Sequence, residues 1–326
     1  MIKNILITGG AGYIGSHIVE YLIKKEFKIF ILDNLSTGHK KLLNKKCKFF
    51  KKDLKKSKGL KEIILENKIH SIIHLAASLD VNESEKNPSK YIANNVKSTL
   101  NLINACKDSL VTCFIFSSTA AVYKDGIYKV NEKSFTKPKS IYGKTKLKSE
   151  KLIKNAFDNS KINYAILRFF NVCGASTSKK IGQINSYDLL FKNLASAILT
   201  KKPKINIYGN DYKTKDGTCI RDFIHVSDLA IVHEKLLNKI NKLKKSITLN
   251  VGYGFGTSVL EVVKSFEKYS KKKIKIIFYP KRKADLKQII ADNTQIKKFL
   301  NWKPKYNKLS IMVRSSISWE KKLFNL

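Results

Sequence analysis

The stretch Gly9-Gly10-Ala11-Gly12-Tyr13-Ile14-Gly15 decides the fold of this chain. The apolar run Ile5-Leu6-Ile7-Thr8 precedes it, and apolar residues with helical spacing follow it, at positions 18, 19, 22 and 23. A strand, a glycine turn and a helix in this order form a dinucleotide cradle, because the glycines allow a tight turn and a close approach of backbone to a pyrophosphate. Free N–H groups at the start of the helix then face the phosphates. The motif therefore predicts a dinucleotide site at the start of the chain.

Apolar runs alternate with helical patterns through the first half of the chain. The expected strands are 5–8, 28–33, 49–53, 71–75, 112–117 and 163–169, and the clearest expected helices are 88–107 and 141–158. This alternation predicts an α/β fold with a doubly wound parallel sheet of the Rossmann type. After Gly174 the sequence becomes rich in loops, which predicts a smaller mixed α/β lobe. We expect residues 1–172 to form the dinucleotide-binding domain, with segment 223–250 returning to it, and residues 173–326 to form a substrate-binding lobe over the carboxyl edge of the sheet.

The net charge of +39 comes almost entirely from lysine. The 64 basic residues include four arginines, Arg168, Arg221, Arg282 and Arg314, so 60 are lysines, spread along the whole chain. Proteins that read nucleic acids usually recruit arginine for bidentate contacts. The pattern therefore favours a solvated basic surface over specific nucleic-acid binding, although non-specific attraction to polyanions is expected.

The composition also indicates the cellular compartment of the protein. No apolar run approaches the roughly 20 residues that span a bilayer, and glycines interrupt the N-terminal apolar stretch, which argues against a secretory signal. The five cysteines are odd in number and lack C-x-x-C spacing, which favours reduced thiols over disulfides or a zinc site. We therefore expect a cytoplasmic protein without a membrane partner.

Asp33 ends the second expected strand, eighteen residues after Gly15. A carboxylate at that point accepts hydrogen bonds from ribose hydroxyls and repels a 2′-phosphate, so it favours NAD over NADP. The alternative is a turn-forming residue at the strand end.

Tyr142 and Lys146 form a Tyr-x-x-x-Lys pair on one face of an expected helix. A nearby ammonium favours the phenolate, so we expect the pKa of Tyr142 to lie below its usual value of about 10, which suits a base that deprotonates a hydroxyl. Pairs at 21/25, 269/273 and 279/283 share this spacing, but only Tyr142 follows the fifth strand and so lies at the ligand edge. The alternative is an exposed amphipathic pair.

Three further features carry chemistry. Ser117-Ser118-Thr119 closes the fifth strand, where hydroxyls either bond a reacting oxygen or cap a turn. Arg221 and Arg282 stand out in a chain that otherwise uses lysine, which suggests a guanidinium fork on a diphosphate; a structural ion pair with Asp222 or another neighbour is the alternative for Arg221. His70 and the histidine four residues later flank a strand and lie about 13 Å apart, so we expect no metal site.

Several longer stretches share one pattern. They are Thr8-Gly9-Gly10-Ala11-Gly12-Tyr13-Ile14-Gly15-Ser16-His17, Asp33-Asn34-Leu35, His74-Leu75-Ala76-Ala77, Asn94-Asn95-Val96, Ser117-Ser118-Thr119-Ala120-Ala121-Val122-Tyr123, Tyr142-Gly143-Lys144, Arg168-Phe169-Phe170-Asn171, Gly209-Asn210-Asp211-Tyr212, Asp216-Gly217-Thr218 and Arg221-Asp222-Phe223-Ile224-His225-Val226. With them the chain resembles the extended short-chain dehydrogenase/reductase family over nearly its whole length, and most closely the UDP-glucose (UDP-galactose) 4-epimerase branch.

The resemblance implies roles for individual residues. Tyr142 matches the catalytic base, Lys146 its partner on the nicotinamide ribose, and Thr119 the hydroxyl that bonds the sugar 4-OH. The implied NAD-binding residues are Gly9, Gly12, Tyr13, Ile14, Gly15, Asp33, Asn34, Asp53, Leu54, Ala76, Ala77, Asn94, Ser117, Tyr142, Lys146 and Phe170. The implied residues of the nucleotide-sugar lobe are Thr119, Asn171, Leu190, Tyr208, Arg221, Arg282, Asp285 and Ile289, with Asn171 and the two arginines on the diphosphate and Asp285 on the uridine side.

The resemblance also implies a reaction. Tyr142 takes the 4-OH proton while the C4 hydride passes to NAD, the keto sugar swings about its diphosphate, and the hydride returns to the opposite face, so NAD stays bound. A homodimer through the helices at 88–107 and 141–158 is implied as well. Related dehydratases place an Asp-Glu pair after the threonine, where this chain has Ala120-Ala121, which disfavours dehydration.

Three positions depart from the family pattern. Leu189 stands where a nucleotide contact is often Asn or His, and Leu79 where a lysine can lie near the cofactor phosphates. Ile289 stands where a bulky tyrosine or a smaller residue gates the sugar pocket, and we predict that it admits some 2-N-acetyl sugars. The alternatives left open are another NAD-dependent nucleotide-sugar enzyme, such as a UDP-N-acetylglucosamine or UDP-uronate 4-epimerase or a UDP-glucuronate decarboxylase, and, remotely, a non-catalytic NAD-sensing or RNA-binding Rossmann protein.

Overall fold

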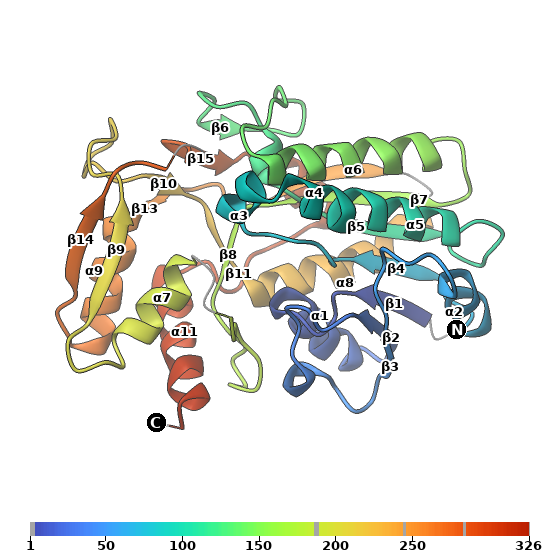
Figure 1. Ribbon diagram of the computed structural model, residues 1–326, viewed down its shortest axis with the longest axis horizontal. Helices are drawn as coiled ribbons and strands as arrows, with labels where there is room; N and C mark the ends of the chain where they lie inside the picture. Colours follow the sequence, from blue (N-terminus) through green and yellow to red (C-terminus); the bar gives the residue numbers. More distant parts are fainter. Residues whose placement is uncertain (1–3, 186–188, 244–245, 283–284, 326) are drawn as a thin grey trace.

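A twisted parallel sheet forms the larger part of the molecule (Figure 1). The computed structural model describes residues 4–185, 189–243, 246–282 and 285–325. Within them seven strands pair in the spatial order β12 (Ile247–Val251), β7 (Asn163–Phe169), β5 (Cys113–Thr119), β4 (Ser71–His74), β1 (Asn4–Thr8), β2 (Lys28–Asp33) and β3 (Lys48–Lys51). β1, β2 and β3 follow one another towards one edge of the sheet, whereas β4 pairs with the other side of β1. The strand order therefore reverses between β1 and β4, and a crevice opens at the carboxyl ends of these two strands. This confirms the doubly wound fold.

Helices cover both faces of this sheet. α1 (Tyr13–Ile23) and α8 (Val226–Leu243) pack together on one face, and α2 (Leu60–Glu66), α5 (Ser98–Ala105) and α6 (Ile141–Phe157) lie on the other (Figure 1). Ile5 and Ile7 of β1 belong to the apolar cluster of the first face, whereas Leu6 belongs to that of the second. Burial of both faces explains why these strands read as continuous apolar runs.

The smaller lobe combines short strands with helices. Its four-stranded mixed sheet has the order β13 (Thr257–Ser258), β10 (Ile220–Arg221), β15 (Gln288–Ala291) and β6 (Lys129–Val130). Two further pairs are β9 (Lys204–Tyr208) with β14 (Lys275–Tyr279), and β8 (Asn171–Cys173) with β11 (Phe223–His225). The helices after β8, apart from α8, are α7 (Leu190–Ala197), α9 (Val259–Ser270), α10 (Thr294–Leu300) and α11 (Leu309–Leu323). The expected mixed α/β lobe is therefore present.

The two parts exchange segments. α8 and β12, from the segment expected to return, complete the large sheet and its cover, and α10 also packs on them. β6, from the first half of the sequence, pairs with β15 in the lobe. The division between residues 172 and 173 stays a prediction.

Most expected elements agree with the structure to within two residues at each end, and two of them differ in an instructive way. The expected strand 49–53 ends earlier, at Lys51, because Asp53 Oδ1 accepts the backbone N–H of Lys55 at 2.9 Å and starts a turn. The expected helix 88–107 is divided into α4 (Pro88–Tyr91), a π-helical turn η2 (Ile92–Lys97) and α5. Such π turns inside helices occur frequently at functional sites.

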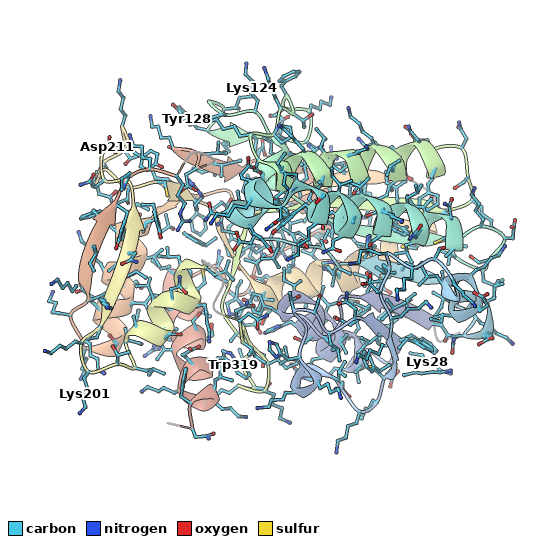
Figure 2. All side chains as sticks on the ribbon, viewed as in Figure 1. Lys28, Lys124, Tyr128, Lys201, Asp211 and Trp319 are labelled. Carbon is cyan, nitrogen blue, oxygen red and sulfur yellow. The ribbon has the colours of Figure 1, made fainter. Side chains whose placement is uncertain are left out.

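Exposed lysines occur on several parts of the surface rather than in one patch. Lys28, Lys124 and Lys201 are exposed on widely separated parts of the molecule (Figure 2). This distribution matches the solvated basic surface expected from composition. No helix in the described ranges is both long enough and apolar enough to cross a bilayer.

Candidate active site

A cleft of about 1260 Å³ runs along the carboxyl edge of the large sheet and reaches the smaller lobe. All the expected cofactor residues line it, as do Thr119, Asn171, Arg221, Arg282, Asp285 and Ile289. Leu190 and Tyr208 line an adjoining cavity of about 180 Å³, which shares Asn171, both arginines and Asp285 with the cleft. The structure thus brings the predicted residues into one continuous site, although their individual roles stay predictions.

The glycine turn forms one end of the cleft. Gly9 follows β1 with φ +73°, and Gly12 precedes the first residue of α1 without a capping bond from any described side chain. The first N–H groups of the helix therefore have no side-chain acceptor, and the first turn lines the cleft. A Cβ on Gly15 would lie 2.2 Å from the carbonyl oxygen of Gly9. This close packing of helix against turn is the geometry that a pyrophosphate cradle requires.

Asp33 closes β2 beside that turn. Its carboxylate is buried and accepts the backbone N–H groups of Ala11 at 3.1 Å and Leu35 at 2.8 Å. Burial raises its pKa above the usual value, and these two bonds oppose the rise. Each oxygen retains a lone pair for a ribose hydroxyl. The residue therefore fits the diol of an NAD adenosine.

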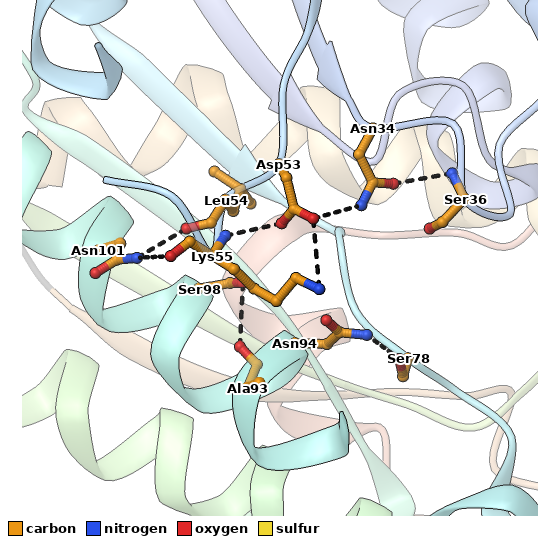
Figure 3. A network of polar contacts seen from close by, with 10 residues as sticks. All are labelled: Asn34, Ser36, Asp53, Leu54, Lys55, Ser78, Ala93, Asn94, Ser98 and Asn101. Atoms are coloured by element: carbon orange, nitrogen blue, oxygen red, sulfur yellow. Dashed lines mark hydrogen bonds and ion pairs between the residues drawn. The ribbon is translucent and has the colours of Figure 1, made fainter. Parts of the chain in front are cut away.

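A polar network continues from there along the cleft (Figure 3). Asp53 Oδ2 accepts the side-chain amide of Asn34 at 3.3 Å and lies 3.5 Å from the ammonium of Lys55. Burial alone would raise the pKa of Asp53, but the hydrogen bonds and the ammonium outweigh it and lower the pKa. The carboxylate is thus held ionised with a fixed orientation at the cofactor end of the cleft.

The π-helical turn supplies the opposite wall of the cleft. The side-chain amide of Asn94 donates to Ser78 Oγ at 2.7 Å (Figure 3), and Asn95 Oδ1 accepts the backbone N–H of Ser78 at 2.8 Å. The extra residue in the turn lets neighbouring asparagines both hold the segment after β4. Asn94 lines the cleft, whereas Asn95 is buried behind it.

Tyr142 lies in the first turn of α6, which is firmly anchored. Ser140 caps the helix by accepting the N–H of Gly143 at 3.0 Å, and Ser84 Oγ of α3 (Val81–Lys86) accepts the N–H of Tyr142 at 3.1 Å. Thr119, at the end of β5, accepts the N–H of Ala121 at 3.2 Å and hydrogen-bonds the Tyr142 phenol. Tyrosine and threonine therefore converge from different elements.

The expected pKa of Tyr142 is wrong for the protein without bound ligands. Burial raises it to about 12, and only the hydrogen bond from Thr119 opposes the rise. The spacing to Lys146 suggested a lowered pKa, but both groups lose water when they are buried. Lys146 is itself 3% exposed, with its ammonium 4.4 Å above the ring centre of Phe116. Burial lowers its pKa to about 7, while the charge of Glu150 acts in the opposite direction.

This burial predicts a pH-dependent stability difference between the wild type and Lys146→Met, both freed of NAD. Between pH 7 and 10.5 the unfolded chain holds a proton on Lys146 that the folded chain lacks, so wild-type stability rises with pH in that window. The variant should be the more stable protein at pH 7, and its advantage should shrink by about 1.4 kcal/mol per pH unit. Urea unfolding at several pH values measures this; a constant difference would refute it.

The substrate side of the cleft carries the two arginines. Arg221 Nη2 lies 3.6 Å from Asp285 Oδ1, and the guanidinium carbon of Arg282 stacks 3.6 Å above the ring centre of Tyr208. Asp222 does not pair with Arg221, since its carboxylate accepts the N–H groups of Tyr253 and Gly254 at 2.8 Å. The ion pair considered for Arg221 therefore exists, but its partner is another predicted substrate residue.

Ile289 lies beside Arg221 in register between β15 and β10. It is buried in an apolar cluster with Ala120 and Phe170 and lines the cleft. The three departures from the family pattern also lie here: Leu189 lines both cavities, and Leu79 is exposed at the cleft.

The contacts of the loop between β8 and α7 were not predicted from the sequence. Asn185 Oδ1 bonds His39 Nε2 at 2.6 Å, its amide donates to the carbonyl of Thr37 at 2.7 Å, and Trp319 of α11 donates to the carbonyl of Gln183 at 2.8 Å. These bonds fasten the loop across the cofactor end of the cleft. Their partners lie more than a hundred residues apart, so no local signal could have found them.

His74 is a core residue. Its ring nitrogens bond the hydroxyls of Thr8 at 2.7 Å and Thr99 at 3.0 Å, and burial lowers its pKa to about 3. The described residues contain no group of three or more His, Cys, Asp or Glu able to hold a metal ion.

Known proteins that are similar to this chain include enzymes of one family. Residues 5–252 match the model of the NAD dependent epimerase/dehydratase family. The chain is 37% identical to a UDP-glucose 4-epimerase of Lactobacillus helveticus over 98% of its length and 97% of the relative's. Its structure matches a Stenotrophomonas maltophila UDP-glucose 4-epimerase crystallised with NAD and formylated UDP-arabinopyranose (TM-score 0.94, 32% identity, 99% of both chains). It also matches the UDP-Glc/GlcNAc 4-epimerase of Campylobacter jejuni (TM-score 0.85, 41% identity, 98% and 99% of the two chains).

Proposed function

The chain belongs to the NAD dependent epimerase/dehydratase family, and we propose that it interconverts UDP-glucose and UDP-galactose as an NAD-dependent 4-epimerase. The observation that carries this proposal is the position of Thr119, Tyr142 and Lys146 in one cleft between the glycine turn and the arginines of the lobe. A substrate that carries a hydroxyl close to a diphosphate can contact the tyrosine and the arginines of this cleft at the same time.

The chain's residues fit NAD. At Gly9 and Gly15 the turn is too tight for a side chain, the start of α1 is free to receive phosphates, and Asp33 offers acceptors for ribose hydroxyls. Bound NAD supplies an acceptor and donor for the C4 hydrogen of the sugar. Because the oxidised and reduced forms alternate within one turnover, the site can retain its cofactor.

The protein's own groups handle the proton and the diphosphate. Thr119 orients the 4-hydroxyl, and Tyr142 takes its proton and later returns it. Lys146 brings positive charge to the phenol and a donor to the nicotinamide ribose. Arg221 and Arg282 hold the diphosphate, which leaves the sugar free to present either face to the same base.

Elimination chemistry has less support. Ala120 and Ala121 follow Thr119 in the 3₁₀ turn η3 (Ala120–Val122), and Ala121 lines the cleft. Neither side chain can donate or accept a proton, so the two positions after the threonine supply no acid to expel a C6 hydroxyl.

A panel of UDP-sugars tests the proposal. The purified protein, with no added cofactor, should release NAD on denaturation and interconvert UDP-glucose and UDP-galactose by NMR. Decarboxylation of UDP-glucuronate, or turnover of uronic sugars alone, would favour the other nucleotide-sugar enzymes.

We further propose that the protein acts on N-acetylated UDP-sugars. Ile289 is smaller than tyrosine and belongs to an apolar wall of the cleft. The Campylobacter jejuni enzyme that this chain resembles at 41% identity carries both glucose and N-acetylglucosamine in its name. A methyl-bearing acetamide fits an aliphatic wall better than it fits a phenol.

Ile289→Tyr should therefore lose UDP-N-acetylglucosamine turnover at least about tenfold more than UDP-glucose turnover, as pocket size discriminates in other enzymes. Ile289→Val, which makes the wall smaller, is the matched control and should keep both activities. A wild-type protein that turns over UDP-glucose but no N-acetyl sugar would overturn this proposal.

We also propose an oligomeric state and a cellular location for the protein. We infer a homodimer formed through α4, η2, α5 and α6, supported by Ile92 of η2 and Leu100 of α5, which are 50% and 41% exposed. Cytoplasmic location is supported by the five cysteines, all described, which form no disulfide. Light scattering of the protein and of Ile92→Lys tests the dimer.

A further inference from the structure

A buried ionic cluster lies one helix turn beyond Lys146, and none of the roles above uses it. Glu150 is the only acid on α6, and it is 1% exposed. Its Oε1 accepts Ser118 Oγ at 2.5 Å and Arg168 Nε at 3.1 Å, and its Oε2 accepts Arg168 Nη2 at 2.8 Å. The carboxylate is thus held by a bidentate guanidinium from β7 and by a hydroxyl from β5.

Arg168 is fixed in turn by neutral groups. Its Nη1 donates to the carbonyl of Glu132 at 3.2 Å, and its guanidinium carbon lies 4.8 Å from the ring centre of Tyr123. It is one of four arginines among 64 basic residues, and its planar fork makes two parallel bonds that lysine could not make. A buried ion pair adds little net stability over apolar side chains of similar volume. Stability alone therefore does not account for two buried charges beside a reactive lysine.

The charged and titratable groups around Lys146 come from three elements. Tyr142 and Glu150 lie one turn before and after it on α6, His74 faces it from β4, and Arg168 lies behind Glu150 on β7. The nearest part of β5 contributes the ring of Phe116, which is uncharged.

Only one of these neighbours brings negative charge to the lysine. His74 is neutral above pH 4, because burial and Lys146 lower its pKa to about 3. Within the described ranges, Glu150 is the anion that acts on Lys146, and it opposes the effect of burial.

We propose that Arg168 is a positioning residue for the reaction: by holding Glu150 in a bidentate pair, it keeps that carboxylate from capturing Lys146 and leaves the ammonium free to act on Tyr142 and the bound cofactor. This proposal rests on the proposed function of the same site. Without Arg168, the carboxylate would pair with Lys146 and draw its ammonium one turn away from the phenol. Without the charge of Glu150, the unopposed guanidinium would drive Lys146 towards its neutral form.

The two single variants should therefore shift Lys146 in opposite directions. In the NAD-bearing protein labelled with ¹³C-lysine, the NMR signal that disappears in Lys146→Met reports its titration. We expect Glu150→Gln to lower the pKa of Lys146 by about one unit and Arg168→Gln to raise it by about one unit, the effect of gaining or losing a nearby charge. The alkaline limb of the kcat profile should move with each. Shifts of the same sign, or no shift with lower activity, would show a merely structural pair.

Two controls keep the test decisive. The double variant Glu150→Gln/Arg168→Gln removes both charges of the pair, and we expect its Lys146 pKa between those of Glu150→Gln and the wild type; an unchanged value would overturn the proposal even where a single variant fails to fold. Lys192→Gln/Glu320→Gln removes another buried pair, 2.7 Å apart between α7 and α11, and should leave Lys146 unaffected. A wild type that epimerises no sugar would refute the proposed function, while the titration would still be readable.

Discussion

Tyr142→Phe is expected to lower kcat by about 100-fold or more while the protein still carries NAD. The substitution removes one oxygen and leaves the ring, so the wall of the cleft and the start of α6 remain intact. The lost oxygen is the group of the Thr119–Tyr142 pair that can act as a base, because a phenol ionises far more readily than the aliphatic hydroxyl of threonine. Steady-state kinetics and the NAD released on denaturation measure the two effects.

Tyr21→Phe is the matched control for this prediction. Tyr21 lies on α1, four residues before Lys25, and the ammonium of that lysine sits 6.0 Å from the Tyr21 ring centre. The pair has the same spacing but lies outside the residues lining the cleft. The control should keep full activity. Wild-type turnover in Tyr142→Phe would rule this residue out as the base.

Gly15→Ala is expected to abolish NAD retention and to destabilise the protein. The new Cβ would meet the carbonyl oxygen of Gly9 at 2.2 Å and Cα of Gly10 at 2.8 Å, and both are backbone atoms that cannot rotate away. Overpacking of this kind costs about 1–3 kcal/mol in folding free energy. The turn must open to relieve it, which removes the N–H groups from the pyrophosphate position. Bound NAD and urea unfolding provide the measurements.

Gly12→Ala should cause a weaker form of the same overpacking. Its Cβ would meet only the Gly9 carbonyl oxygen, at 3.2 Å, which a shift of a few tenths of an ångström relieves. We expect a smaller loss of stability and partial retention of NAD. Equal losses in the two variants would mean that the spacing within the turn does not control cofactor binding.

Much of the fold could be predicted because its signals are local. The apolar runs, the glycine turn and Asp33 at the end of β2 each depend on residues close in sequence, and the structure places them as expected. The position of Tyr142 at the ligand edge followed from the order of the strands. The interruption of the helix after Tyr91 did not, because a π turn leaves no clear pattern in apolar spacing.

The electrostatics of the site could not be predicted in the same way. The pKa of Tyr142 depends on burial by several elements, and burial outweighs the charge that the spacing to Lys146 suggested. The ion pair of Glu150 with Arg168 joins α6 to β7. The relative position of these two residues is fixed only when the sheet has formed. His39 and Asn185 likewise meet only once the lobe lies against the large sheet.

In the proposed reaction the sugar's C4 hydrogen leaves and returns within one site. The most direct measurement uses UDP-glucose deuterated at C4, incubated with the purified protein without added cofactor and followed by NMR. We predict UDP-galactose that retains deuterium at C4. Product with a solvent proton at C4, or no product from protein that carries NAD, would contradict the account.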